Sequence, residues 1–459
     1  MNKKLLSMIL AGGIAAGMIT GCGDFSDAPD TSGGGKTADG KTEVIFYHWT
    51  PVPEMELMEK TFNETHDDIH LTYKPIPDSP DAMIKMNTML MANEPMDVTS
   101  QWSTDHLQLR VENNLLEGLD QYFEKNDLDY EEVFGTAASE ITTVNGDHYS
   151  MPYANKMFAV MYNKSIFDEA GVDYPQEGWT WDEFDEIAKK VSYGEGVNRV
   201  YGTCFMPKEA WYYRAGLKLG LNAMYKEDGS ASNFDDPAFL ESLQWLYDLQ
   251  EAGAQKPFNE FAEASLDAQA NRIALFYQGG YAMDIVATYP VSNWGSLPDN
   301  AHDFEVGVVT LPVEKKGDPL QTMYEFSDLS MVANSKNKDA AFEFMKWYCI
   351  ERPDVCVAEK YMQPTASYFP TEEIEKTCID KIYSCDGVST EEMLHAYTSP
   401  ESEIARVPGL KFTTIATAQS EIVGEMDKQI EQVFFNEKTP EEAINDLKAN
   451  ADELIAKAK

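Results

Sequence analysis

The chain has 459 residues, 43% of them hydrophobic and 12% aromatic, which is enough for packed cores and more than one core usually serves. We therefore expect two domains. The formal net charge is -42, with 78 acidic against 36 basic residues. Because binding to nucleic acid needs clustered Lys and Arg to neutralise phosphates, this balance argues against nucleic acid as a partner.

The N-terminus has the pattern of an export signal. Asn2–Lys4 is basic, Leu5–Met18 is apolar, and Ile19–Cys22 closes the segment, so we expect residues 1–21 to be a secretory signal peptide. The last four residues resemble a bacterial lipobox, which implies a lipid on Cys22 as the first mature residue. The alternative is a plain signal peptide that happens to contain a cysteine. The lipobox interpretation predicts an exported protein that is lipid-anchored to the outer face of the bacterial cell membrane.

Residues 22–41 are predicted to be a flexible tether, because Gly23–Lys41 is rich in Gly, Asp, Ser, Thr and Pro and has a single aromatic residue. No other run reaches the length of a membrane span. We therefore expect contact with the membrane through the lipid anchor only.

The first part of the mature chain alternates strands and helices. Strands are predicted at Glu43–His48, Ile69–Ile76 and Met96–Thr99, and amphipathic helices at Glu54–Asn63 and Ala82–Ala92. This alternation is typical of a doubly wound parallel sheet. In such sheets the ligand crevice lies beyond the carboxyl ends of the strands. The residues expected there are Trp49, Gln101, Trp102 and Asp105.

The stretch Tyr149–Phe184 is predicted to cross into a second lobe and begin it. Phe158–Tyr162 is an apolar strand, and Asn163 is placed to cap the helix Lys164–Ala170. Thr180 and Glu183 are spaced as a capping box, with Trp179 and Phe184 placed as its hydrophobic staple.

Later segments continue the α/β pattern. A capped helix is expected after Asp236, and another is expected after Thr439, where Pro440 takes the first helical position. The remaining expected elements are a strand at Tyr201–Phe205, apolar runs at Ile273–Phe276 and Tyr281–Val286 flanking Gly279-Gly280, a second crossing at Val306–Pro312, a strand at Phe326–Val332, a helix at Asn337–Cys349 and a third crossing near Gln363-Pro364.

The order of these motifs resembles the extracellular solute-binding proteins of ABC importers, in particular the sugar-binding family that includes maltodextrin receptors. The residues that carry the resemblance are Tyr162-Asn163-Lys164, Ala170-Gly171, Trp179–Phe184 and Gly279–Met283. The resemblance implies a periplasmic-binding-protein-like α/β fold, with two doubly wound lobes joined by hinge crossings. The implied boundaries are 42–152 plus 312–363 for lobe one and 153–311 plus 364–459 for lobe two. It also implies docking on the permease subunits of an ABC transporter. We expect a monomer.

Aromatic residues at predicted strand ends and loops suggest a sugar site. A sugar offers an apolar face for stacking on a flat ring, and a rim of hydroxyls for acids and amides. For any single aromatic, ordinary core packing is the alternative. The expected ligand-binding residues are Trp49, Gln101, Trp102, Asp105, Tyr153, Asn155, Trp211, Tyr212, Asp284, Tyr289, Glu325 and Asp328.

These observations predict a lipid-anchored receptor that captures an oligosaccharide, with no catalytic residues, no cofactor and no metal. His66 and His70 are four residues apart, but a strand is predicted to begin at Ile69, so the spacing does not bring them together. The alternatives are an exported, lipid-anchored glycan hydrolase or adhesin, or the same fold binding a peptide or polyol. The cysteine pairs 349/356 and 378/385 leave open a disulfide between the two segments or free buried thiols.

Overall fold

The computed structural model describes residues 35–458, apart from 49–52, 77–79, 102–103, 267, 293–294, 296, 356–362, 367–368, 385–386, 399–403, 411–412 and 416. The signal peptide, Cys22 and most of the tether therefore lie outside the described residues. Within the described part of the chain, no helix is long and apolar enough to cross a membrane.

The first sheet contains the three strands predicted near the start of the mature chain. β1 (Thr42–His48) pairs in parallel with both β2 (Ile69–Pro75) and β3 (Val98–Gln101). Helices α1 (Pro53–Thr65) and α2 (Pro80–Met91) connect these strands, so the predicted alternation is confirmed. The full strand order is β12 (Gln363–Pro364), β6 (Met151–Met157), β11 (Gln321–Met331), β3, β1 and β2, with β13 (Ala405–Pro408) paired to β11.

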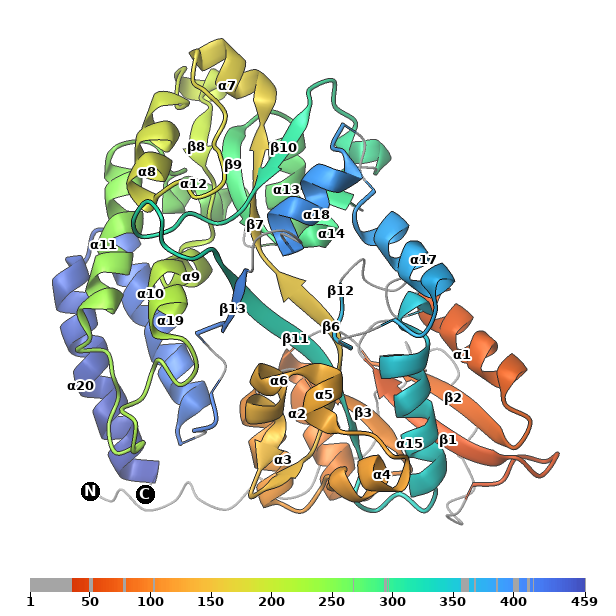
Figure 1. Cartoon of the computed structure of the whole chain (residues 1–459). Coiled ribbons are helices and arrows are strands. Elements are labelled where there is room, and N and C mark those ends of the chain that lie inside the picture. The colour runs from red at the N-terminus through yellow and green to blue at the C-terminus, as the bar shows by residue number, and fades with distance from the viewer. Residues whose placement is uncertain are drawn as a thin grey trace, which may run out of the picture. The chain divides into compact units, whose positions relative to one another are not determined.

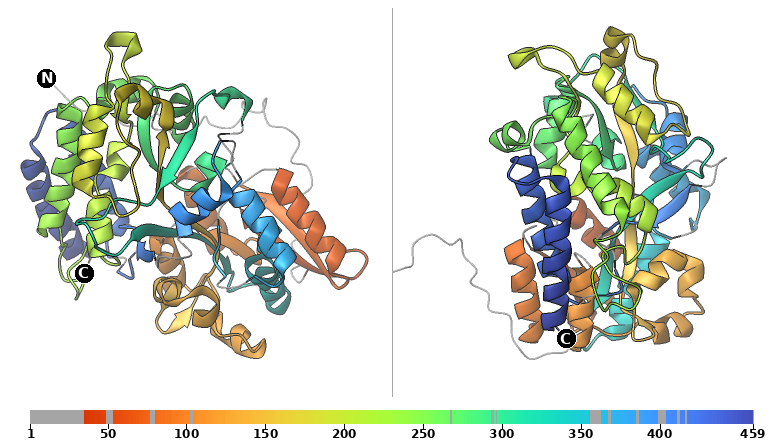
Figure 2. Two further views of the ribbon diagram at one scale, coloured as in Figure 1. Left: turned by 45° about the horizontal axis from the view of Figure 1, so that its top comes forward. Right: turned by 90° about the vertical axis from the view of Figure 1, so that its left-hand side faces the viewer.

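The second sheet has the order β10-β7-β9-β8 and is fully buried along β7 (Ala159–Asn163) and β9 (Tyr281–Val286). β10 (Val306–Val309) runs antiparallel to β7, and β8 (Tyr201–Thr203) runs parallel to β9. The strands belong to a core that is separate from the core of the first sheet. The two C-terminal helices, α19 (Gln419–Phe434) and α20 (Pro440–Ala458), lie side by side and add apolar residues to this second core (Figure 2).

The helix signals in the central stretch are confirmed. Asn163 accepts a hydrogen bond from the amide of Ile166 at the start of α7 (Lys164–Ala170), and Gly171 ends this helix in the left-handed region at φ 66°. Thr180 and Glu183 form a reciprocal capping box at the start of α8 (Trp181–Lys190). The rings of Trp179 and Phe184 lie 5.5 Å apart, as expected for the staple.

The chain crosses between the sheets where β6 (Met151–Met157) of the first sheet leads into β7, and where β10 is followed by β11 (Gln321–Met331) (Figure 1). β6 and β11 pair in antiparallel fashion, with a register shift between Ser327 and Asp328. β13 (Ala405–Pro408) pairs in parallel with the start of β11. Because both β6 and β13 pair with β11, both strands belong to the first sheet. The predicted boundaries of the two lobes stay predictions.

The other elements are mostly short helices around the two sheets. They are α3 (Thr104–Glu112), α4 (Asp120–Lys125), α5 (Tyr130–Phe134), α6 (Thr136–Thr142), β4 (Thr143–Val144), β5 (Asp147–His148), η1 (Gly196–Asn198), α9 (Pro207–Ala210), α10 (Tyr213–Leu219), α11 (Pro237–Glu251), α12 (Phe258–Glu263), α13 (Gln269–Tyr277), α14 (Thr288–Ser292), η3 (Pro298–Asn300), α15 (Lys338–Lys346), η4 (Trp347–Glu351), β12 (Gln363–Pro364), α17 (Glu372–Ile382) and α18 (Thr390–Thr398).

Three cysteines are described, and each carries a free, buried thiol: Cys204, Cys349 and Cys378. Cys356 and Cys385 lie outside the described residues. Only one cysteine of each pair, Cys349 and Cys378, is therefore described, and its thiol is free. Burial raises the pKa of Cys378 to about 12, which keeps this thiol protonated and unreactive at neutral pH.

Candidate functional site

The crossing strands β6 and β11 present two different faces. Side chains alternate along a strand, and residues paired in register lie on the same face. Lys156 pairs with Glu325, and its ammonium nitrogen lies 3.9 Å from a carboxylate oxygen of Glu325. Met157 pairs with Tyr324 on the opposite face. The strands that join the sheets therefore carry an ion pair on one side and apolar groups on the other.

Tyr289 brings a segment of the second sheet to this ion pair. It lies in α14, which follows β9, and its hydroxyl donates a hydrogen bond to the side-chain oxygen of Gln269. The ring packs against the core of the first sheet. Burial raises the pKa of Tyr289, and the nearby ammonium of Lys156 opposes that rise. The structure therefore brings the ring of Tyr289 and the amide of Gln269 within electrostatic range of the Lys156–Glu325 ion pair.

Glu209 and Tyr212 complete this group from α9 and the turn after it. Burial raises the pKa of the Tyr212 hydroxyl well above its ordinary value, and the carboxylates of Glu209 and Glu325 add to the rise. Glu209 also raises the pKa of Tyr289. Its half-buried carboxylate makes no side-chain hydrogen bond or ion pair within the described part of the chain. We define the hinge cluster as Lys156, Glu209, Tyr212, Gln269, Tyr289 and Glu325.

Two other predicted residues of the second sheet are buried in its interior. Trp211 is 0% exposed and packs against Phe239 at a ring distance of 6.0 Å. Asp284 accepts a hydrogen bond of 2.8 Å from the hydroxyl of Tyr281 and lies 3.7 Å from the guanidinium of Arg272. Burial outweighs the attraction of Arg272 and raises the pKa of Asp284 to about 6. Both side chains take part in core packing.

Gln101 and Asp328 are neighbours in register on β3 and β11. Arg110, which is 0% exposed, donates a hydrogen bond of 2.7 Å to the side-chain oxygen of Gln101. Burial raises the pKa of Asp328 to about 7, although Ser150 and Arg110 lower it. These polar groups form a buried network in the first sheet, away from the hinge cluster.

Tyr153 and Asn155 lie on β6, and both are buried in the first sheet. The hydroxyl of Tyr153 lies 3.2 Å from a ring nitrogen of His48, and the amide of Asn155 donates a bond of 3.3 Å to the carbonyl of Pro364. Trp49, Trp102 and the side chain of Asp105 lie outside the described residues, so their predicted roles stay predictions.

The structure therefore groups three of the predicted residues: Tyr212, Tyr289 and Glu325. Sequence reasoning did not select their neighbours Lys156, Glu209 and Gln269. Lys156 could have been predicted from the sequence. It directly follows Asn155 on the predicted crossing strand, and successive side chains of a strand point to opposite faces. Nothing in the local sequence marks Gln269, which begins a helix.

The hinge cluster has the groups that a neutral sugar needs: a flat ring, an amide, carboxylates as acceptors and an ammonium as donor. Among the described residues, no group of three or more His, Cys, Asp and Glu side chains is arranged to hold a metal ion. His66, one half of the spaced histidine pair, stacks on Phe62 at 3.9 Å.

The known proteins that this chain resembles in sequence are binding proteins. A family model described as bacterial extracellular solute-binding protein matches residues 50–348. A putative binding protein of Brucella abortus is 25% identical over 451 residues, covering 96% of this chain and 98% of that protein. A maltotriose-binding protein of Pyrococcus abyssi is 24% identical over 317 residues, covering 67% of this chain and 63% of that protein.

Among solved structures, this chain is similar to an ABC substrate-binding protein from Listeria monocytogenes in complex with cycloalternan. The TM-score is 0.71 at 21% identity, covering 91% of this chain and 99% of the other. This likeness confirms the predicted fold class, a periplasmic-binding-protein-like α/β fold.

Proposed function

The chain belongs to the family of bacterial extracellular solute-binding proteins, and we propose that it is the lipid-anchored substrate-binding component of an ABC importer. In this role it captures an oligosaccharide between its two lobes and delivers it to the membrane permease. Membership of this family makes the chain a binding protein rather than an enzyme, so the hydrolase alternative is set aside.

The observation that carries the proposal is the composition of the hinge cluster. Lys156 and Glu325 come from the first sheet, whereas Tyr289 and Gln269 come from segments next to the second. A ligand that touches both sets binds the closed arrangement more tightly and so selects it. The names of the maltotriose-binding relative and of the cycloalternan complex support an oligosaccharide as the ligand class.

A glycan panel tests the ligand class. The mature protein is titrated with neutral oligosaccharides, a polyol and a short peptide, while tryptophan fluorescence and melting temperature are followed. A bound ligand stabilises the folded protein by mass action, so the melting temperature rises with ligand concentration. We expect this rise with at least one oligosaccharide, which is then recovered intact. A response to the peptide or polyol alone would overturn the proposed ligand class.

The lipid anchor needs a separate experiment, because Cys22 lies outside the described residues. Cys22→Ala is expected to release the protein from the membrane fraction without changing glycan affinity. A Cys22→Ala protein that stays in the membrane fraction would contradict the anchor and leave the ligand class untouched.

A further inference from the structure

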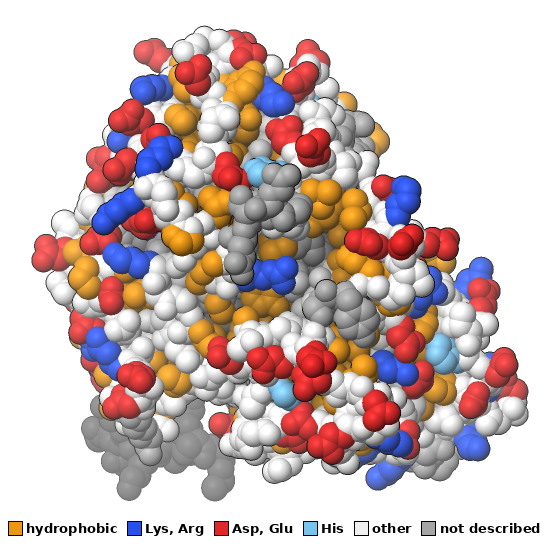
Figure 3. All heavy atoms as spheres, viewed as in Figure 1, with side chains coloured by type: hydrophobic (Ala, Val, Ile, Leu, Met, Phe, Trp, Pro, Cys, Tyr) orange, Lys and Arg blue, Asp and Glu red, His pale blue; other side chains and the backbone are white. Residues whose placement is uncertain are grey.

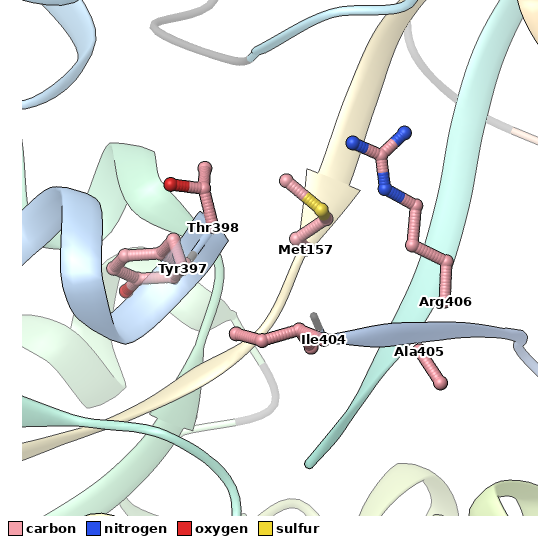
Figure 4. A pocket seen from close by; sticks show the side chains of 6 residues that line it. All are labelled: Met157, Tyr397, Thr398, Ile404, Ala405 and Arg406. Atoms are coloured by element: carbon pink, nitrogen blue, oxygen red, sulfur yellow. The ribbon is translucent and has the colours of Figure 1, made fainter. Parts of the chain in front are cut away.

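A cavity of about 440 Å³ lies beside the start of β13. It is lined by Met157 at the end of β6, by Tyr397 and Thr398 at the end of α18, and by Ile404, Ala405 and Arg406 at β13 (Figure 4). This volume falls in the range of small-molecule pockets. None of these residues belongs to the hinge cluster.

Strand register places this cavity on the other side of the crossing strands from the hinge cluster. Met157 directly follows Lys156 on β6 and therefore points to the opposite face. Arg406 pairs with Thr322, two residues before Tyr324, and Tyr324 pairs with Met157. Arg406 and Met157 thus share a face. The proximity of Arg406 to Tyr324 agrees with this, since Arg406 opposes the rise in the pKa of Tyr324 that burial causes.

Arg406 differs from the other arginines of the chain. Its side chain is exposed, makes no hydrogen bond or ion pair within the described residues, and lies beside the cavity in Figure 4. The other five arginines all have acceptors: Gln101 for Arg110, the carbonyl of Gly253 for Arg199, Glu314 for Arg214, Asp284 for Arg272 and Asp354 for Arg352. Arg406 is therefore the one arginine whose guanidinium has neither an acid nor any other acceptor within the described part of the chain, although the chain carries 78 acidic residues.

The rest of the lining is mostly apolar, and hydrogen bonds hold two of its side chains in place. Tyr397 is 0% exposed, and its hydroxyl donates a bond of 2.9 Å to the carbonyl of Ala287, so its ring cannot swing away. Thr398 donates its hydroxyl proton to the carbonyl of Leu394 at 2.7 Å. Met157 and Ile404 supply aliphatic surface. Figure 3 shows apolar side chains and a basic side chain near the middle of the face seen in Figure 1, with carboxylates spread over the rest of that face.

We propose that this cavity is a second binding site, separate from the hinge cluster, for a small organic carboxylate with an apolar body. The planar guanidinium of Arg406 offers two parallel N–H donors, the geometry that a carboxylate accepts. Ile404 is half-buried at the edge of the cavity, next to the buried Tyr397 and Met157, and receives the apolar body. A neutral amide of the same shape would lose the charge-assisted pair.

The test is calorimetric titration of the mature protein with benzoate and, in parallel, with benzamide at 150 mM NaCl. We expect saturable binding of benzoate at one site and at least tenfold weaker binding of benzamide. Arg406→Gln should weaken benzoate at least tenfold, and Arg406→Lys should weaken it less. Because the Arg406 side chain holds no other group in place, both variants should fold with an unchanged melting temperature. The matched control is Lys156→Gln, which removes one cation from the opposite face and should leave benzoate binding unchanged.

Two results would overturn the proposal. Loss of benzoate binding in Lys156→Gln with retention in Arg406→Gln would place the anion in the hinge cluster. Equal affinity for benzoate and benzamide would show that the charge of the ligand does not contribute to binding.

Discussion

Lys156 and Glu325 face each other across β6 and β11, with 3.9 Å between the ammonium nitrogen and a carboxylate oxygen, and each side chain is about one-third exposed. An exposed ion pair of this kind contributes little to stability, roughly 0–1 kcal/mol. Its position at the crossing between the sheets, within electrostatic range of Tyr289, agrees with the ligand-binding role that we propose for it.

Tyr289 should contribute to binding through its ring. We expect Tyr289→Ala to weaken oligosaccharide binding roughly tenfold or more, as removal of a central aromatic contact usually does. Tyr289→Phe keeps the ring and removes the hydroxyl that bonds to Gln269, so its loss of affinity should be smaller. Calorimetric titration of both variants measures the difference. Equal affinity in all three proteins would remove Tyr289 from the site.

Glu209 should bind ligand through its carboxylate, because that group has no partner within the described part of the chain. Hydrogen bonds to charged groups contribute about 1.5–3 kcal/mol, so Glu209→Gln is expected to weaken glycan binding roughly tenfold. Its melting temperature without ligand should stay unchanged. A variant that binds normally but melts earlier would assign Glu209 to folding instead.

Trp211 was predicted as a ligand contact, but its burial at 0% exposure against Phe239 points to a role in packing. Trp211→Ala should lower the free energy of unfolding by roughly 3–5 kcal/mol, measured by urea denaturation. Trp211→Phe retains more of the volume and should cost less. Loss of glycan affinity at full stability would restore Trp211 to the binding site.

Asp185 should make stability depend on pH. Burial raises the pKa of its carboxyl to about 6, against the opposing hydrogen bond of 2.6 Å from the indole of Trp245. The folded state therefore holds a proton that the unfolded state releases near pH 4. The resulting stabilisation is present below about pH 4 and is lost as the pH rises through about 6.

Asp185→Asn should reduce the fall in unfolding free energy between pH 4 and 7, measured by urea denaturation. It should not abolish that fall, since burial also raises the pKa of Asp284 to about 6 and of Asp328 to about 7. Glu186→Gln, an exposed position on the same helix, is the control and should keep most of the wild-type pH profile. An unchanged profile in Asp185→Asn would contradict the raised pKa.

Much of the fold follows from local rules. The capping box of Thr180 and Glu183, the cap at Asn163 and the proline after Asp236 each depend on a few neighbouring residues, and all three were predicted. The site depends on contacts between distant segments. Lys156 comes within electrostatic range of Tyr289 only because two crossing strands and the segment after β9 converge. No local sequence pattern predicts that convergence.

The burial of individual aromatic side chains was as hard to predict from the sequence as the contacts between distant segments. Trp211 and Tyr212 are adjacent in the sequence, yet Trp211 packs against α11 while Tyr212 lies near Glu209 and Glu325. The two rings point in different directions because both residues lie in the turn that follows the four-residue helix α9. Sequence alone gives the composition of such a turn but not the direction of each ring.

Hydrogen exchange tests the central claim, that an oligosaccharide binds at the hinge cluster. Exchange is measured by mass spectrometry on the mature protein, with and without a saturating concentration of a glycan that binds in the panel. We expect slower exchange in peptides from both sheets, those that contain Lys156, Glu209, Tyr212, Tyr289 and Glu325. Protection elsewhere, with these peptides unchanged, would contradict it.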